Sequence, residues 1–214
     1  NANSIIQDTL KHFVPELREK YPGVSLALEG QNKEMAQTQA SMVSGFALGL
    51  VGVFLLLSFQ FRSYLEPVVV MVAIPLSFIG VVWGHLAMGL DISMPSLLGF
   101  VSLAGIVVNN SILLMGFIKI RFADGDTVVE AAAKASEGRF RAIFLTSVTT
   151  LLGLLPILSE TSLQAQILIP LVTSLVFGLL SSTVLVLVVI PSLYTILNDI
   201  GLTTLTKSEI PEGD

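Results

Sequence analysis

The stretch PSLLGFVSLAGIVVNNSILLMGFIKI, residues 95–120, decides the fold of this chain. Its single charged residue is Lys119, close to one end. The hydrocarbon core of a bilayer is about 30 Å thick, and a helix needs about 20 apolar residues to cross it. Residues 95–120 therefore predict a membrane-spanning helix. Asn109 and Asn110 stand out within it, because an unpaired amide is costly in lipid.

The same length and apolar character recur four more times along the chain. The whole sequence is 53% hydrophobic and 13% charged, whereas soluble domains have about 25% charged residues. We therefore predict an all-α polytopic membrane protein with five transmembrane helices within residues 41–200. Pro75 is expected to kink the second helix and Pro170 the early part of the fifth. The predicted spans are residues 42–61, 65–90, 95–120, 140–158 and 167–193.

The first 40 residues have a different character, mixing charged and apolar groups. Apolar residues at helical spacing predict a helix over residues 4–20. VSLALEG, residues 24–30, alternates apolar and polar side chains and predicts a strand with one buried face. One helix and one strand cannot enclose a core. We interpret residues 1–40 as an α+β remnant of a larger subdomain, and residues 31–41 as a helical lead into the membrane.

Lys and Arg residues are distributed unevenly among the connections. They lie in or beside the first and third connections and in the tail over residues 201–214, while the second and fourth connections hold none. Basic connections are typically cytoplasmic, so we expect a cytoplasmic C-terminus and an N-terminal segment on the outer side, the periplasm of a bacterium. The basic residues concerned are Arg62, Lys119, Arg121, Lys134, Arg139, Arg141 and Lys207.

The third connection contains DGDTVVEAAAKASEG, residues 124–138. Its composition predicts a short helix over about residues 126–137, capped by Asp126 and ended by Gly138. Its apolar residues favour a helix on the cytoplasmic surface of the membrane, with an exposed polar connector as the alternative.

Polar and small residues follow one face of three predicted spans. In a bilayer such faces contact other helices or a hydrated cavity, so three of them imply an enclosed interface. For any single residue, ordinary helix packing is the favoured interpretation. The GxxxG spacing of Gly80 and Gly84 weakly indicates close helix contact, as does that of Gly45 and Gly49. For His85, near the outer end of its span, an interfacial or packing role is favoured over a proton-relay role. The three stripes are Ser102, Gly105, Asn109 and Gly116; Arg139, Thr146, Thr150 and Gly153; and Ser174, Gly178 and Ser181.

Several function classes find no support in the sequence. There is no cysteine, the two histidines lie far apart, and no carboxylate falls mid-membrane. The motifs HExxH, GxGD and GxSG are missing, as is a glycine-rich phosphate loop. The net charge of -5 comes without a dense basic run. We therefore expect no enzyme activity, no cofactor, no metal site and no nucleic-acid partner.

Several strings, taken in order, carry a family resemblance. The chain resembles the C-terminal membrane half of a resistance-nodulation-division (RND) efflux transporter of the hydrophobe/amphiphile efflux, or acriflavine-resistance-like, branch. YPGVSLALEG, residues 21–30, is similar to the end of that family's periplasmic porter domain. The membrane strings are FLLLSFQFRSYLEPVVVMVAIPLSFIG, residues 54–80; GLDISMPSLLGFVSLAGIVVNNSILLMGFI, residues 89–118; RFRAIFLTSVTTLLGLLPIL, residues 139–158; and VLVVIPSLY, residues 186–194.

The resemblance implies a proton antiporter of the bacterial inner membrane that exports hydrophobic or amphiphilic compounds. Such pumps are homotrimers with twelve membrane helices per subunit in two repeated halves, and these five spans would be the eighth through twelfth. The implied partners are membrane lipids, the missing N-terminal half, an adaptor protein and an outer-membrane channel. The alternatives are an RND exporter of lipids or envelope components, and a non-transporting membrane scaffold or assembly fragment.

The resemblance also implies a proton relay. The family's GxxxKN pattern puts its relay lysine at Asn109 and the following asparagine at Asn110, while Arg139 and Thr146 match its relay arginine and threonine. The aspartates of the relay belong to the other half. Asn109 departs from the pattern, because a neutral amide cannot form the lysine's salt bridge to those aspartates and lower their pKa. Gly116 likewise replaces an acidic residue of many members. Asn109 remains assigned beside the relay as a hydrogen-bonding residue.

Overall fold

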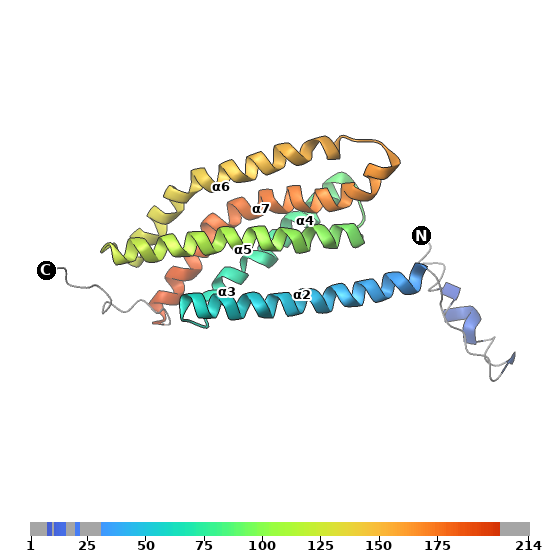
Figure 1. Ribbon diagram of the computed structural model, residues 1–214, viewed down its shortest axis with the longest axis horizontal. Coiled ribbons are helices and arrows are strands. Elements are labelled where there is room, and N and C mark those ends of the chain that lie inside the picture. The colour runs from blue at the N-terminus through green and yellow to red at the C-terminus, as the bar shows by residue number, and fades with distance from the viewer. Residues whose placement is uncertain (1–7, 10, 16–19, 22–30, 202–214) are drawn as a thin grey trace. The chain divides into compact units, whose positions relative to one another are not determined.

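The computed structural model describes residues 8–9, 11–15, 20–21 and 31–201 (Figure 1). Of the helix predicted over residues 4–20, residues 8–9, 11–15 and 20 are helical. The strand predicted over residues 24–30 and nearly all of the tail lie outside the described residues, so the α+β remnant stays a prediction. The chain divides into two compact units, Asn1–Gly45 and Phe46–Asp214, and the second contains the predicted membrane domain.

Five helices of the described chain are long and apolar enough to cross a membrane, which confirms the predicted all-α polytopic fold. The helices are α2 (Gln31–Phe61), α3 (Glu66–Met71), α4 (Ala73–Met88), α5 (Met94–Ala123), α6 (Val128–Leu158) and α7 (Leu163–Asp199). The candidate spans are Gln37–Phe61, Glu66–Met88, Met94–Ala123, Val128–Leu158 and Leu163–Asp199.

The second span is broken into α3 and α4 at Val72. Pro75 causes the break, because it has no N–H to donate to the carbonyl of Met71 and its ring crowds that carbonyl. Hydrogen bonds from the amide of Val72 to Val68 O (3.0 Å) and from that of Leu76 to Val72 O (3.4 Å) flank the break. The predicted kink is confirmed.

The fourth span begins earlier than predicted. Residues 128–137 form the first turns of α6 and continue into the span without a break, so the separate surface helix over residues 126–137 is wrong. Thr127, not Asp126, caps the helix, and Gly138 lies inside it. The physical reason is the alanine-rich sequence, whose strong helix propensity outweighs the single glycine.

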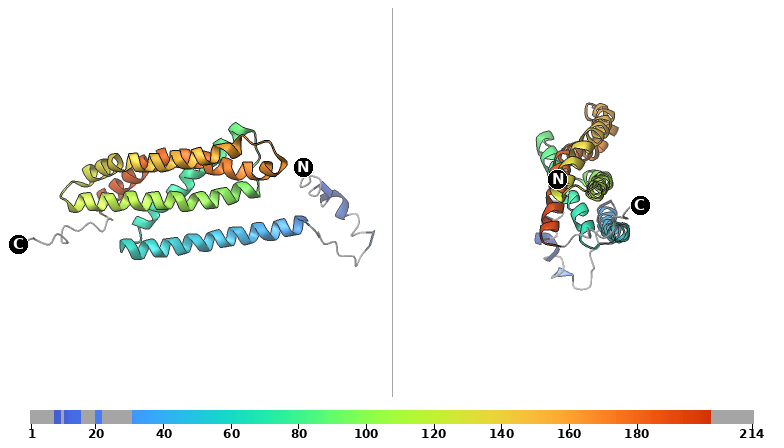
Figure 2. Two further views of the ribbon diagram at one scale, coloured as in Figure 1. Left: turned by 45° about the horizontal axis from the view of Figure 1, so that its top comes forward. Right: turned by 90° about the vertical axis from the view of Figure 1, so that its left-hand side faces the viewer.

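The centre of the second unit is a packed group of α4, α5 and α7, which run side by side (Figures 1 and 2). Glycines allow these helices to approach closely. A Cβ on Gly178 would collide with the side chain of Leu103 on α5, and a Cβ on Gly80 or Gly84 would collide with Phe177 on α7. The Gly80–Gly84 pair therefore marks a close helix contact, as the spacing indicated.

The helices α2 and α6 contribute much less to this core. Only 6% of the apolar segment of α2 and 11% of that of α6 is buried, against 50% for α7. From Phe46 onward, α2 contributes Leu57 and Phe61 to the core, and the rings of Phe46 and Phe100 lie 6.0 Å apart between centroids. A large part of the surface of both helices is available to lipid or to further helices.

Candidate functional site

The α5 residues assigned to the relay lie on an open side of the helix. Asn109 is exposed and Asn110 is half-buried. Neither amide side chain forms a hydrogen bond with another described residue. A Cβ on Gly105 or Gly116 would meet no atom within 4 Å, so this face of α5 has no neighbouring helix among the described elements.

The matching face of α6 is open in the same way. Thr146 and Thr150 are exposed, and their hydroxyl groups donate only within α6. The Thr146 hydroxyl donates to Ile143 O at 2.9 Å, and the Thr150 hydroxyl to Thr146 O at 2.8 Å. A Cβ on Gly153 would also meet open space.

Arg139 joins these two helices. Its guanidinium lies over the ring of Phe117 on α5, 3.7 Å from the ring centroid, a geometry in which the ring face attracts the cation. Its Nε is buried and has no hydrogen-bond partner among the described residues. Buried N–H groups normally have a partner, and this donor has none among the described residues.

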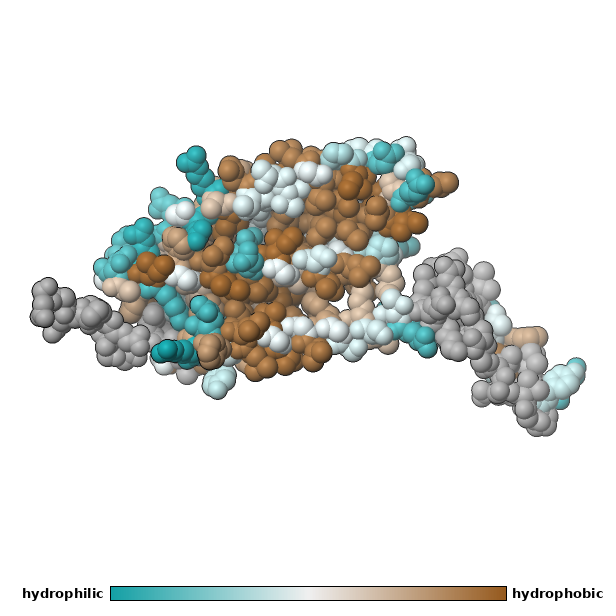
Figure 3. Space-filling view, viewed as in Figure 1, coloured by the Kyte–Doolittle hydropathy of each residue, from teal (hydrophilic) through white to brown (hydrophobic). Residues whose placement is uncertain are grey.

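We call the small and polar residues on the open sides of these two helices the open polar face. Figure 3 shows such residues in rows along α5 and α6, between hydrophobic surfaces. The structure thus brings together the predicted stripes of the third and fourth spans on helices that pack against each other. The face comprises Ser102, Gly105, Asn109 and Gly116 of α5 and Thr146, Thr150 and Gly153 of α6.

The third predicted stripe, on α7, is turned into the chain: Ser174 and Gly178 are buried and Ser181 is half-buried. Ser174 is 0% exposed and donates to the backbone oxygen of Ser96 on α5 at 2.8 Å. Gly178 fits against Leu103. These residues hold α7 to α4 and α5, whereas the stripes of α5 and α6 face outward. The three stripes therefore form one internal contact and one open face rather than a single enclosed interface.

His85 also belongs to the internal packing. It is 2% exposed, and both ring nitrogens have partners: Nδ1 lies 2.9 Å from Val81 O, and Nε2 lies 2.7 Å from Ser96 Oγ. Ser93 and Ser96 form a capping box at the start of α5. The ring therefore ties α4 to the beginning of α5.

Sequence reasoning missed a buried ion pair at the opposite end of α5. Glu66 is 0% exposed, and Lys119 Nζ lies 2.5 Å from its Oε2. The ammonium also lies over the ring of Phe61, 5.0 Å from its centroid. Tyr194 of α7 is fully buried, and Glu66 is close enough to influence its hydroxyl group. This pair connects the end of α2 and the start of α3 to α5 and α7.

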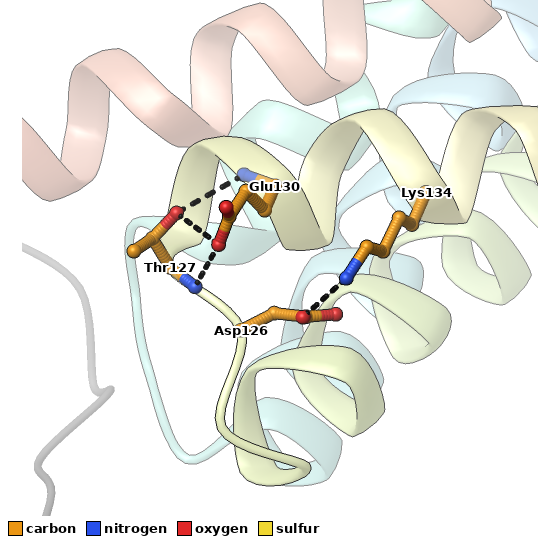
Figure 4. Close-up of polar contacts among 4 residues, drawn as sticks. All are labelled: Asp126, Thr127, Glu130 and Lys134. Carbon is orange, nitrogen blue, oxygen red and sulfur yellow. Dashed lines mark hydrogen bonds and ion pairs between the residues drawn. The ribbon is translucent and has the colours of Figure 1, made fainter.

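The start of α6 forms a separate polar cluster (Figure 4). The amide and hydroxyl of Thr127 donate to Glu130 Oε2 at 3.0 and 2.9 Å, and the amide of Glu130 donates to Thr127 Oγ1 at 3.4 Å. Lys134 forms an ion pair with Asp126 at 2.5 Å. These hydrogen bonds satisfy backbone N–H groups at the start of α6. The ion pair with Asp126 neutralises the charge of Lys134.

Comparison with known proteins identifies the family of this chain. Residues 3–198 match the AcrB/AcrD/AcrF family. The chain belongs to this family of RND efflux transporters. Its five apolar helices are the membrane part of such a transporter and make it a multi-pass membrane protein.

The relatives named differ in the compounds that their names mention. The chain is 28% identical over 192 residues to the toluene efflux pump membrane transporter TtgB of Pseudomonas putida, an alignment covering 90% of this chain and 18% of TtgB. It is 30% identical over 161 residues to the cobalt-zinc-cadmium resistance protein CzcA of Cupriavidus metallidurans, covering 75% of this chain and 15% of CzcA.

The chain is also similar to solved structures of efflux pumps. The crystal structure of a heavy metal efflux pump matches with a TM-score of 0.71 and 26% sequence identity, over 89% of this chain and 20% of that one. The chain therefore spans at most about a fifth of the length of these relatives.

Proposed function

We propose that the open polar face is half of a proton relay in a proton-driven exporter of the bacterial inner membrane. The observation that supports this proposal is the exposed amide of Asn109 on a helix that is otherwise mostly apolar. Polar side chains in membrane helices normally face other helices or a hydrated cavity. In the full-length transporter, helices carrying the titrating carboxylates would cover this face.

Each residue has a distinct role in this proposal. Asn109 and the Thr146 hydroxyl hydrogen-bond the carboxylates, since an amide and a hydroxyl can each both donate and accept. Arg139 supplies a fixed positive charge on its guanidinium group. Its Nε donor, which has no partner among the described residues, is available to a carboxylate. Asn110, which is half-buried, supports the packing of α5. Protonation of the carboxylates would then change the hydrogen bonds that hold the two halves together.

Efflux assays of the full-length protein test this proposal. We expect Asn109→Ala and Thr146→Ala each to reduce efflux of a hydrophobic dye at unchanged expression. Ser192→Ala is the matched control, because Ser192 is also exposed and bonds only within its own helix, donating to Val188 O at 2.7 Å. Full efflux in both relay variants would overturn the assignment.

The substrate and topology belong to the same proposal. We infer export of hydrophobic or amphiphilic compounds by a homotrimer that works with a periplasmic adaptor and an outer-membrane channel, with the C-terminus of this chain cytoplasmic. The resemblance of the membrane strings and the similarity to the toluene pump TtgB support this class. Expression in a pump-deficient host should lower accumulation of hydrophobic dyes. Protection against cobalt, zinc and cadmium, the metals in the name of the resistance protein CzcA, without any effect on dyes would instead favour metal export.

A further inference from the structure

The outer side of the contact between α6 and α7 contains an apolar groove. It has a cavity of about 340 Å³, and half of its lining is contributed by each helix. The rings of Phe140 and Phe144 stack along its α6 wall, with 5.7 Å between centroids and 12° between planes. Val184 and Val188 form part of the opposite wall and are 64% and 62% exposed. The groove is thus open to the surroundings of the bundle along its length.

The floor of the groove offers no free polar atom. Ser147 Oγ lies 2.7 Å from Thr183 Oγ1, and the Thr183 hydroxyl is 2.7 Å from Leu179 O. Since these hydroxyl groups are already satisfied, water gains little by entering, and an apolar occupant loses nothing. The groove therefore fits a hydrocarbon chain.

The length of the groove matches one leaflet of a bilayer. From Phe140 to Leu151 its α6 wall follows about 16 Å of helix at 1.5 Å per residue. Half of a hydrocarbon core of about 30 Å is close to that value. An acyl chain that starts at the end near Phe140 would fill the groove to its other end.

Positive charge lies at the end where a headgroup would sit. Arg141 is exposed and follows Phe140 directly. It precedes Val148 of the groove by seven residues, so both lie on nearly the same side of α6. Glu137 lies one turn away, but the two form no ion pair in the described structure. Unlike Lys119 and Lys134, which are paired, Arg141 has no acidic partner among the described residues.

We propose that the α6–α7 groove is a binding site for an anionic phospholipid, with one acyl chain between Phe144 and Val184 and the headgroup phosphate on Arg141. Basic pockets between membrane helices are known to bind anionic headgroups, and an arginine donates two parallel hydrogen bonds to a phosphate. This site is independent of the proposed relay, because it lies between α6 and α7 and uses none of the relay residues.

Native mass spectrometry of the full-length transporter tests the site, using phosphatidylglycerol and phosphatidylethanolamine as probes. The wild type should retain phosphatidylglycerol in preference to phosphatidylethanolamine. Arg141→Gln should weaken phosphatidylglycerol binding about tenfold, which is typical for loss of a charged hydrogen-bond donor. Arg141→Lys should restore most of it, and Arg121→Gln, at an exposed arginine of α5, should leave it unchanged.

A second pair of variants tests the groove itself. Val148→Phe fills the cavity from its α6 wall and should lower phosphatidylglycerol binding, whereas Leu152→Phe, at an exposed residue outside the lining, should not. Equal retention of both lipids in the wild type and all variants would overturn the proposal. Displacement of the lipid by the transported dye would also overturn it, in favour of a substrate site.

Discussion

The two polar regions of α5 differ in whether this chain completes them. At one end, Lys119 forms an ion pair with Glu66, its ammonium lies over the ring of Phe61, and the carboxylate is fully buried. In the middle, Asn109 is exposed. Both regions are polar and both interrupt an apolar helix, yet one is closed by contacts within the chain and the other is open.

This difference separates two uses of polarity in a membrane helix. A buried ion pair fixes the position of helices, because separating the two charges would leave each of them uncompensated. An open amide has no such internal function and is costly unless other helices cover it. Variants at the closed region should therefore change stability, while variants at the open region should change transport.

The largest effect should follow from breaking the ion pair. Lys119→Met leaves the buried Glu66 carboxylate without its ammonium, which should lower the free energy of unfolding by about 3 kcal/mol. Titration of the purified protein with SDS in mixed micelles measures this change. Arg121→Met, two residues further along and exposed, is the matched control and should change stability little.

A double variant shows whether the loss comes from the pair itself. Glu66→Gln combined with Lys119→Met should be more stable than Lys119→Met alone, because no uncompensated charge remains. Purely additive losses would contradict an energetic coupling between the two side chains.

A smaller effect should distinguish the glycines of the two regions. Gly178→Ala adds a Cβ that collides with Leu103, and overpacking of this kind costs about 1–3 kcal/mol. Gly105→Ala adds a Cβ in open space and should not lower the stability of this chain. Thermal unfolding in detergent compares the two. Equal losses in both variants would place a neighbour against Gly105, which must then come from outside the described chain.

The smallest effect concerns two adjacent hydroxyl groups. Ser147→Ala removes the hydrogen bond to Thr183 between α6 and α7, which should lower stability by about 0.6 kcal/mol. Thr146→Ala removes only bonds within α6 and should leave stability unchanged while reducing efflux. Unfolding and dye efflux should be measured on both variants. A loss of stability in Thr146→Ala as large as that in Ser147→Ala would contradict the prediction.

Hydropathy and proline positions were enough to predict the five spans and the break near Pro75, because both depend on local sequence. The first turns of α6 were assigned wrongly, since charged residues and Gly138 resembled a boundary in a stretch with no real helix breaker. The ion pair could not be foreseen, because Glu66 and Lys119 are far apart in sequence and each resembled an ordinary loop charge. An acidic residue directly before Pro67, at the start of an apolar run, was the one available signal.

The candidate site was predictable in a different sense. Helical spacing grouped Asn109 with Gly105 and Thr146 with Thr150, and the structure shows each group on one side of its helix. Spacing could not tell which groups are buried within the chain. That depends on the packing of α7 against α4 and α5, which glycines such as Gly178 permit.

The position of Glu66 has a consequence for biosynthesis. The ribosome makes this carboxylate before it makes Lys119, fifty-three residues later, and Tyr194 later still. Until α5 emerges, the carboxylate has no ammonium to meet, and burying it alone in lipid is unfavourable. The hairpin of α2 and α3 must therefore keep Glu66 at the aqueous edge of the bilayer, and the arrival of α5 at the insertion site completes its burial.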